Sequence, residues 1–219
     1  MVITIDGTSG SGKSTTGKLV AKELHCAFLS SGEIYRAITV IIMNSKVDIS
    51  NETQILKELS QSKIEIKDED NLATFYINGI KALKHELHSP QVSNIVPKIA
   101  PFKRVREFAR NLQHQFANQE KTIVVEGRDV GSVVFPNADY KFYITADLEI
   151  RARRRFEEYK SENNNVTYEN VYASLKTRDY ADETRKLGKL VIPNNAIVID
   201  TSHITLNEAV NQVLSHIKY

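Results

Sequence analysis

The sequence predicts an α/β fold in which a parallel sheet is flanked by helices, and three observations support this prediction. Short apolar runs recur along the chain, helical patterns fall between them, and a glycine-rich loop follows the first apolar run. Strands that are apolar on both faces are typical of parallel sheets covered by helices on each side. The 219 residues are enough for one such domain with insertions.

The apolar runs that predict buried strands are 2–5, 27–29, 122–125, 140–144 and 196–199. The segments in which apolar residues recur at helical spacing are 14–24, 32–44, 104–119, 148–160, 168–183 and 206–217. Thr205 and Glu208 form a capping box at the start of the last helix. Residues 62–85 instead alternate apolar and polar side chains, with DEDN and NG as turns, which predicts a small antiparallel sheet inserted into the core.

The loop after the first predicted strand has the spacing of a phosphate-binding loop. Its sequence, GTSGSGKST, fits the pattern G-x-x-x-x-G-K-[ST]. Glycines let backbone N–H groups approach phosphate oxygens at the start of a helix. In this pattern Lys13 reaches the β- and γ-phosphates, and the Ser14 hydroxyl binds Mg²⁺. The strand, loop and helix follow in the required order, which disfavours a glycine-rich turn with an incidental lysine.

The predicted architecture is therefore a sheet of the P-loop NTPase type that binds a nucleoside triphosphate. The loop residues expected to contact it are Gly7, Thr8, Ser9, Gly10, Ser11, Gly12, Lys13, Ser14 and Thr15.

Composition limits the possible settings and partners. Hydrophobic residues make up 41% and charged residues 26%, which is ordinary for a soluble globular protein. The net charge of +2 gives no global indication of nucleic acid or a membrane surface as a partner. Cys26 is the only cysteine, so no internal disulfide is possible and a reduced, cytoplasmic setting is expected. We expect no signal peptide, because no basic segment precedes the first strand, and no apolar run approaches the ~20 residues of a membrane span.

Arginines recur where predicted strands end or helices begin. SSGEIYR and EGRD each follow a strand, RARRR lies at the start of a helix, and RDYADETR lies on the next one. Open α/β sheets bind ligands in the crevice outside the carboxyl ends of their strands. The alternative for each cluster is a solvated or ion-paired face, and EEYK after RARRR offers it partners. A guanine-recognising N-K-x-D motif is missing from the sequence, which weighs against a GTPase switch.

Six segments occur in the order and spacing found in bacterial cytidylate kinases: IDGTSGSGKST, SSGEIYR, FKRVRE, EGRDVGSVVFPNA, RARRR and RDYADETR. From its first residue to about Arg185, the chain resembles the CMP/dCMP kinase family of nucleoside monophosphate kinases. The resemblance implies a single kinase domain over 1–219. Its core would comprise about 1–60, 101–150 and 185–219, with a monophosphate-binding insertion at about 61–100 and an arginine-rich lid at about 151–167.

The resemblance also implies an activity: ATP-dependent phosphorylation of CMP and dCMP by in-line transfer, with Mg²⁺. Arg36, Arg128 and Arg185 match the clamp on the CMP phosphate. Arg106 and Asp129 match the pair that recognises the cytosine edge. The full set matched to CMP binding is Ser31, Tyr35, Arg36, Arg106, Arg128, Asp129, Arg178, Asp182 and Arg185.

The arginines of RARRR match the lid over ATP. Arg151 is expected to contact ATP, whereas Arg154 and Arg155 are expected to act with Lys13 in catalysis. The sequence departs from the family at three places. Pro97 stands where a serine usually helps to contact cytosine. Gly188, Lys189 and Leu190 replace the usual APL, and Glu126 replaces an aspartate.

Two alternatives remain open at this point. One is a P-loop kinase of another acceptor, such as UMP, AMP or shikimate, and the other is a nucleotide-dependent regulatory or RNA-binding module. The near-neutral charge and the lack of tryptophan weigh against the second. We expect no nucleic-acid or membrane partner, and a monomer, because no helix shows a sustained apolar heptad seam.

Overall fold

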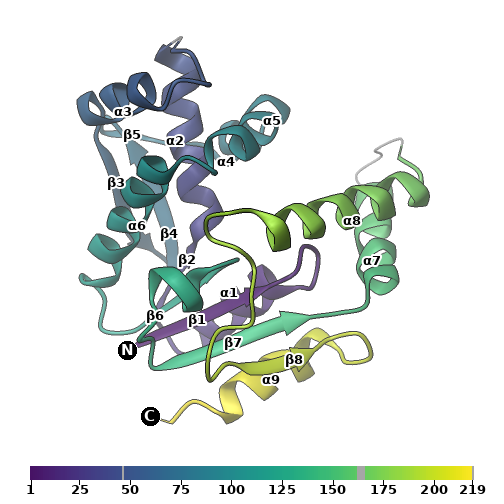
Figure 1. Ribbon diagram of the computed structural model, residues 1–219. Coiled ribbons are helices and arrows are strands. Elements are labelled where there is room, and N and C mark those ends of the chain that lie inside the picture. Colours follow the sequence, from purple (N-terminus) through teal and green to yellow (C-terminus); the bar gives the residue numbers. More distant parts are fainter. Residues whose placement is uncertain (46, 162–165, 219) are drawn as a thin grey trace. The chain divides into compact units, whose positions relative to one another are not determined.

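The computed structural model describes residues 1–45, 47–161 and 166–218. These residues fall into two units, Met1–Leu24 with Val124–Tyr219 and His25–Ile123. Figure 1 shows their elements along the chain. Residues 162–165, the middle of the polar segment expected at the tip of the lid, lie outside the described residues.

The first unit is built on parallel strands in the order β6 (Ile123–Gly127), β1 (Val2–Gly7), β7 (Tyr140–Thr145) and β8 (Ile197–Asp200). Strand β7 pairs in parallel with both β1 and β8. Ile5 and Phe142 are register partners, and both are fully buried. Burial on both faces explains why these strands are continuous apolar runs, and the predicted parallel sheet is confirmed.

Helices α1 (Lys13–Glu23) and α9 (Leu206–Ser215) pack against each other beside this sheet. The predicted capping box starts α9. The Thr205 hydroxyl accepts a hydrogen bond from the Glu208 backbone N–H, and the Glu208 carboxylate accepts one from the Thr205 N–H. A short π-helical turn over Val130–Val134 follows β6 and was not predicted.

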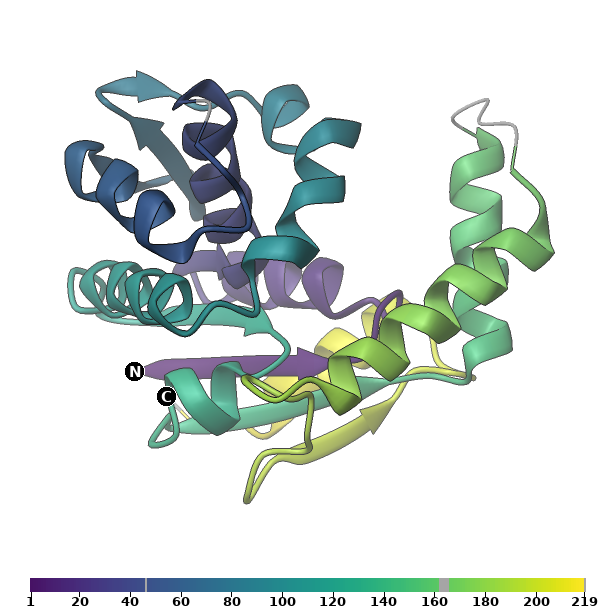
Figure 2. The ribbon, with the colours of Figure 1, turned by 45° about the horizontal axis from the view of Figure 1, so that its top comes forward.

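Helices α7 (Leu148–Ser161) and α8 (Tyr168–Thr184) form a pair with a small core of its own (Figure 2). Ala152, Val171 and Leu175 are buried between them. The rings of Phe156 and Tyr168 meet edge to face with centroids 6.3 Å apart. This packing fixes the two helices to each other, so the arginines at the start of α7 have a rigid support.

The second unit contains the inserted antiparallel sheet. Strands β3 (Ile64–Glu69), β4 (Leu72–Ile77) and β5 (Ile80–Lys81) pair antiparallel, and β4 also pairs in parallel with β2 (Ala27–Ser30). Asp70 and Asn71 in the β3–β4 turn have φ values of 55° and 64°, which asparagine and aspartate tolerate better than most residues. The antiparallel sheet predicted within residues 62–85 is confirmed over residues 64–81, whereas Lys84 and His85 begin a helix.

Five helices complete the second unit: α2 (Ser31–Ser45), α3 (Glu52–Gln61), α4 (Lys84–Leu87), α5 (Pro90–Ile99) and α6 (Lys103–Ala117). Helix α2 packs through the fully buried Ile34 and Ile38. Sequence patterns predicted α2 and α6, whereas α3 and α4 were missed. Within the described part of the chain, no helix combines the length and apolarity needed to cross a membrane.

Candidate functional site

The glycine-rich loop joins β1 to α1, as the sequence predicted. A Cβ atom at Gly7 would lie 1.9 Å from the carbonyl oxygen of Ile144, so the loop can begin here only with glycine. Gly12 is the N-cap of α1 with a φ of 87°, a conformation that glycine adopts without strain. These two constraints bring the loop backbone to the positive end of α1, where an anion is favoured.

Lys13, the first residue of α1, is buried in the first unit. Its Nζ donates a hydrogen bond to the Thr8 carbonyl at 3.2 Å, and the Ser11 hydroxyl donates to the same oxygen at 3.0 Å. Burial, with a smaller contribution from the positive charges of Arg128 and Arg178, lowers the pKa of Lys13 to about 7. Cationic groups that disfavour one another in this way are stabilised by a bound anion.

Arg128, at the end of β6, meets two residues of the RDYADETR segment. Its Nε donates to Asp182 Oδ2 at 2.6 Å. The other carboxylate oxygen, Asp182 Oδ1, accepts from Nη1 of Arg185 at 3.3 Å, and Arg185 also lies 3.9 Å from Asp129 Oδ1. One unit thus gathers four of the residues predicted to bind CMP. Asp182 is shared between two guanidinium groups.

The three arginines expected in the lid differ in their surroundings. Arg151 is buried, and its donors go to protein oxygens: Nε to the Ala146 carbonyl at 2.7 Å and Nη1 to the Ser9 carbonyl at 2.9 Å and to Asp179 at 2.6 Å. Arg154 donates through Nη2 to the Thr201 carbonyl at 2.6 Å. The contacts with Ser9, Asp179 and Thr201 were not predicted, because each joins residues that are distant in sequence.

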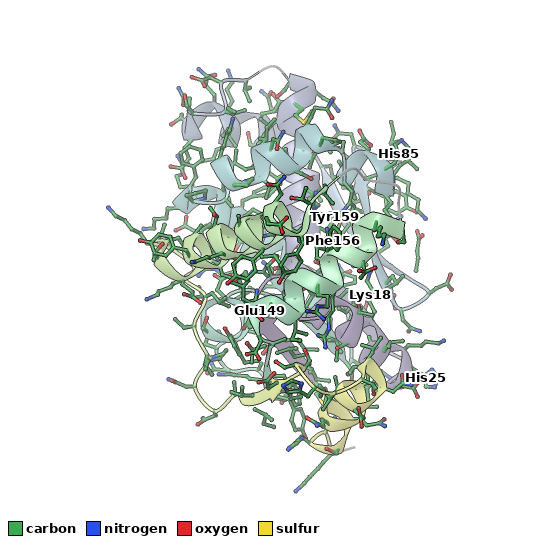
Figure 3. The ribbon with its side chains drawn as sticks, turned by 90° about the vertical axis from the view of Figure 1, so that its right-hand side faces the viewer. Lys18, His25, His85, Glu149, Phe156 and Tyr159 are labelled. Carbon is green, nitrogen blue, oxygen red and sulfur yellow. The ribbon has the colours of Figure 1, made fainter. Side chains whose placement is uncertain are left out.

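Arg155 is partly exposed on α7. It pairs with Glu158 at 2.6 Å, and its guanidinium lies 4.6 Å from the centroid of the Tyr159 ring. Figure 3 shows Phe156 and Tyr159 at the contact between α7 and α8. Arg155 therefore fits the alternative raised for this cluster, which is ion pairing with the EEYK segment. Its predicted catalytic role stays a prediction.

A hollow of about 360 Å³ opens beside the loop, on the side of α1 and α9. Its lining combines the loop, the lid and the start of α9. The residues are Ser11, Gly12, Thr15, Thr16, Arg154, Thr201, Ile204, Thr205, Leu206 and Ala209. Thr16 and the last five were not predicted as site residues. The capping box at Thr205 located the start of α9 in the sequence but carried no information about a ligand.

In the second unit, Ser31, Tyr35 and Arg36 lie on α2, where the sequence placed them after a strand. Arg36 Nη1 donates to the Leu87 carbonyl at 3.0 Å and to the Ser93 hydroxyl at 3.1 Å. The Arg106 guanidinium lies 5.9 Å from the centroid of the Tyr35 ring. The second unit thus brings Tyr35 and Arg106 together. The predicted pair Arg106–Asp129 draws on both units and stays a prediction.

Pro97 lies within α5, three residues before the C-cap, Ala100. Proline has no N–H to donate within a helix. The Ala100 carbonyl accepts a hydrogen bond from Arg106 Nη1 at 3.3 Å. The end of the helix that contains Pro97 therefore helps to orient a residue predicted to recognise cytosine.

Two buried carboxylates of the first unit were not predicted as part of the site. Asp6 accepts hydrogen bonds from the backbone N–H groups of Val130 at 2.8 Å and Gly131 at 2.7 Å, which holds the turn that follows Arg128 and Asp129. Burial raises the pKa of Asp6 to about 6. Asp179, on α8, contacts Arg151 and the loop. An acid at the end of a buried strand is a sequence signal for Asp6, whereas Asp179 lies in the RDYADETR segment but was not singled out there.

Proteins of known family resemble this chain over almost its whole length. The family model described as "Cytidylate kinase" matches residues 3–219. The cytidylate kinase of Clostridioides difficile is 36% identical over 217 residues, covering 99% of this chain and 98% of that protein. The cytidylate kinase of Caldanaerobacter subterraneus is 38% identical, covering 99% and 94%.

Solved structures share the fold at low sequence identity. An uncharacterized protein from Eubacterium ventriosum aligns with a TM-score of 0.56 at 12% identity, covering 99% of this chain and 98% of that one. TT1252 from Thermus thermophilus aligns with a TM-score of 0.55 at 15% identity, covering 100% and 98%. These likenesses bear on the fold alone.

Proposed function

Because this chain belongs to the cytidylate kinase family, we propose that it transfers the γ-phosphoryl group of ATP to CMP and dCMP. The products are ADP with CDP or dCDP. The cationic cluster around the buried Lys13 is the observation that carries the proposal. Its charge is disfavoured by burial and by Arg128, and phosphate groups would relieve that cost.

The donor half of the proposal assigns ATP to the first unit. The N–H groups of residues 7–15 and Lys13 bind its phosphates, and the hollow between α1 and α9 accommodates the base and ribose. Arg154 lines this hollow beside the loop, which supports a role next to ATP. The apolar side chains of Leu206 and Ala209 suit a planar base.

Mg²⁺ fits this donor set. Among the residues that the structure describes, no cluster of three or more His, Cys, Asp or Glu side chains could hold a metal. Mg²⁺ with a nucleotide needs only one or two protein ligands, because phosphates and water supply the rest. The Ser14 hydroxyl, on the first turn of α1, would hold it. When bound, the ion neutralises charge on the β- and γ-phosphates.

The acceptor half assigns CMP to the arginine clusters. Arg36, Arg128 and Arg185 bind its phosphate, and Arg178 and Asp182 lie around its ribose. The acceptor oxygen is already anionic near neutral pH, so positioning and charge neutralisation along an in-line path suffice without a general base.

Arg106 and Asp129 recognise the base. Cytosine presents an amino donor beside two acceptors, which suits one carboxylate and one guanidinium. Tyr35 stacks beside Arg106 and limits its freedom. Ser31, buried at the first turn of α2, lies on the same helix as Tyr35 and Arg36.

Closure of the 151–167 lid excludes water, which suppresses ATP hydrolysis. We retain three further expectations as part of the proposal: one kinase domain over 1–219, a monomer, and action in the cytoplasm, where a lone buried Cys26 stays reduced.

An assay of ADP release with five nucleotides and shikimate as acceptors tests the proposal. CMP and dCMP should give kcat/KM values at least tenfold above UMP, AMP and GMP, with shikimate inactive. Equal rates with UMP or AMP, or a preference for either, would contradict cytosine recognition by Arg106 and Asp129. Tight ATP binding with no transfer to any acceptor would instead favour a regulatory module.

A further inference from the structure

One residue of the phosphate-binding loop is held by both α7 and α8. The backbone N–H of Ser9 donates to Asp179 Oδ1 at 3.2 Å, and its carbonyl accepts from Arg151 Nη1 at 2.9 Å. The same Nη1 donates to Asp179 Oδ2 at 2.6 Å. Both backbone polar groups of Ser9 are therefore bonded to one ion pair, with Arg151 from α7 and Asp179 from α8.

This arrangement is buried and closely packed. Ser9, Arg151 and Asp179 are exposed by only 6%, 5% and 9%. Gly10, the next residue of the loop, lies against the pair of helices. A Cβ atom at its position would be 3.5 Å from Arg151 Cβ and 3.8 Å from a Leu175 methyl group. The loop thus has a fixed place on the helices at the point where its N–H groups begin to converge.

A buried ion pair is weak evidence for stability, because desolvation offsets most of the attraction between the charges. Its geometry suits positioning better. Hydrogen bonds to charged groups are stronger than neutral ones, and two of them act here on a single loop residue. A carboxylate with two oxygens can orient the guanidinium and the Ser9 N–H at once, which a neutral side chain of the same shape cannot do equally well.

We infer that Asp179 is a positioning residue for the phosphoryl donor. With Arg151, it holds Ser9 so that the loop is pre-organised to bind the phosphates of ATP. This inference rests on the proposed function for the identity of the donor. It assigns a role to a residue that does not itself contact a nucleotide, and it gives Arg151 a structural task in the loop beyond any contact with ATP.

Equilibrium binding of a non-hydrolysable ATP analogue, with no acceptor present, tests this inference. Asp179→Asn keeps the shape of the side chain but removes its charge, so the analogue's Kd should rise at least tenfold. Glu183→Gln is the matched control, because it makes the same acid-to-amide change at an exposed position on α8. Its Kd should stay within twofold of the wild-type value.

The same variants in steady-state kinetics separate positioning from general damage. Asp179→Asn should raise the KM for ATP while leaving the KM for CMP within twofold, and Asp179→Glu should recover part of the loss. Equal increases for both nucleotides, or an unchanged Kd for the analogue, would overturn the inference. Because the binding experiment uses no acceptor, it stands even if CMP is not the substrate.

A measurement on the unmodified protein covers the case in which Asp179→Asn fails to fold. The Ser9 amide should exchange with solvent slowly in the absence of nucleotide, with a protection factor of at least a hundred by NMR, because its N–H is bonded to a buried carboxylate. Exchange as fast as in an exposed loop would overturn the inference.

Discussion

Asp179 and Asp182 lie one turn apart on α8, and each makes an ion pair of 2.6 Å with an arginine, yet their second oxygens have different partners. In Asp179 that oxygen accepts the Ser9 N–H of the phosphate-binding loop. In Asp182 it accepts from a second arginine, Arg185. The Asp179 carboxylate therefore bonds one guanidinium group and one backbone N–H, whereas the Asp182 carboxylate is shared between two guanidinium groups.

This difference separates two tasks on one helix. A balanced pair has little charge left for a ligand, so it orients the loop. The second cluster, in which Arg185 also lies 3.9 Å from Asp129, keeps its guanidinium groups nearer the surface, which suits an anionic acceptor. The exposed fractions agree: the Arg151 side chain is 6% exposed, whereas Arg128 and Arg185 are 15% and 23% exposed. The helix therefore serves the donor at Asp179 and the acceptor at Asp182.

Lys13 gives the largest test, because it is the residue proposed to bind the phosphoryl group that is transferred. Lys13→Ala should lower kcat with ATP and CMP by at least about a thousandfold, since cationic contacts to the transferring phosphoryl group are worth that much. The fold should survive, because the buried ammonium is itself disfavoured in the free protein. Thermal unfolding should confirm an unchanged or raised Tm.

Lys22→Ala is the matched control, an exposed lysine in the last turn of the same helix. It should keep kcat within twofold. Turnover of Lys13→Ala within about tenfold of the wild type would mean that the loop does not hold the transferring phosphate.

Sequence patterns predicted most of the fold because periodicity depends on neighbouring residues. The strands around Ile5 and Phe142, and the antiparallel alternation of β3 and β4, follow directly from which faces are buried. Helix α5 is harder, because Pro90 and Pro97 indicate breaks to a sequence-based analysis. Helix α3 was missed although Ile55 and Leu59 have helical spacing, because ten residues give only two buried positions.

The residues of the candidate site were predicted from sequence motifs, but the contacts that these residues make with one another were not. The loop, Arg128 and Asp182 could be identified from spacing and from the family resemblance. The bond from Arg151 to Ser9 joins residues 142 positions apart, so only the fold brings them together. Sequence alone could not distinguish Arg151, whose donors bond protein oxygens, from arginines that are more exposed to a ligand.

Asp6 extends the comparison to a buried carboxylate whose two hydrogen bonds come from backbone N–H groups and not from arginine. Burial raises its pKa by more than the two backbone bonds lower it. Its pKa is raised from 3.8 to about 6 by burial, so the folded state keeps a proton that the unfolded state has released. The contribution of Asp6 to stability should therefore fall as pH rises from about 4 to 6. At most it falls by about 3 kcal/mol, from roughly 1.4 kcal/mol per pKa unit.

Urea unfolding of the wild type and of Asp6→Asn at pH 4, 5, 6 and 7 measures this. The wild-type free energy of unfolding minus that of the variant should decrease between pH 4 and 6 and then level off. A difference that is constant with pH would show that the Asp6 carboxyl has an ordinary pKa in the folded state.

Asp182→Asn gives the smallest expected effect and the closest test of the comparison. The change removes the charge that Arg128 and Arg185 share but keeps the shape of the side chain, so both guanidinium groups lose an orienting partner. The KM for CMP should rise by about tenfold, which corresponds to one charge-assisted hydrogen bond of about 1.4 kcal/mol. The KM for ATP should stay within twofold, because Ser9 is bonded to Asp179 and not to Asp182. Steady-state kinetics with each nucleotide varied in turn, on this variant and on Asp179→Asn, should therefore give a crossed pattern, in which one aspartate affects the acceptor and the other the donor. If both variants raised the KM of the same nucleotide, α8 would have one task, and the different partners of the two aspartates would have no functional meaning.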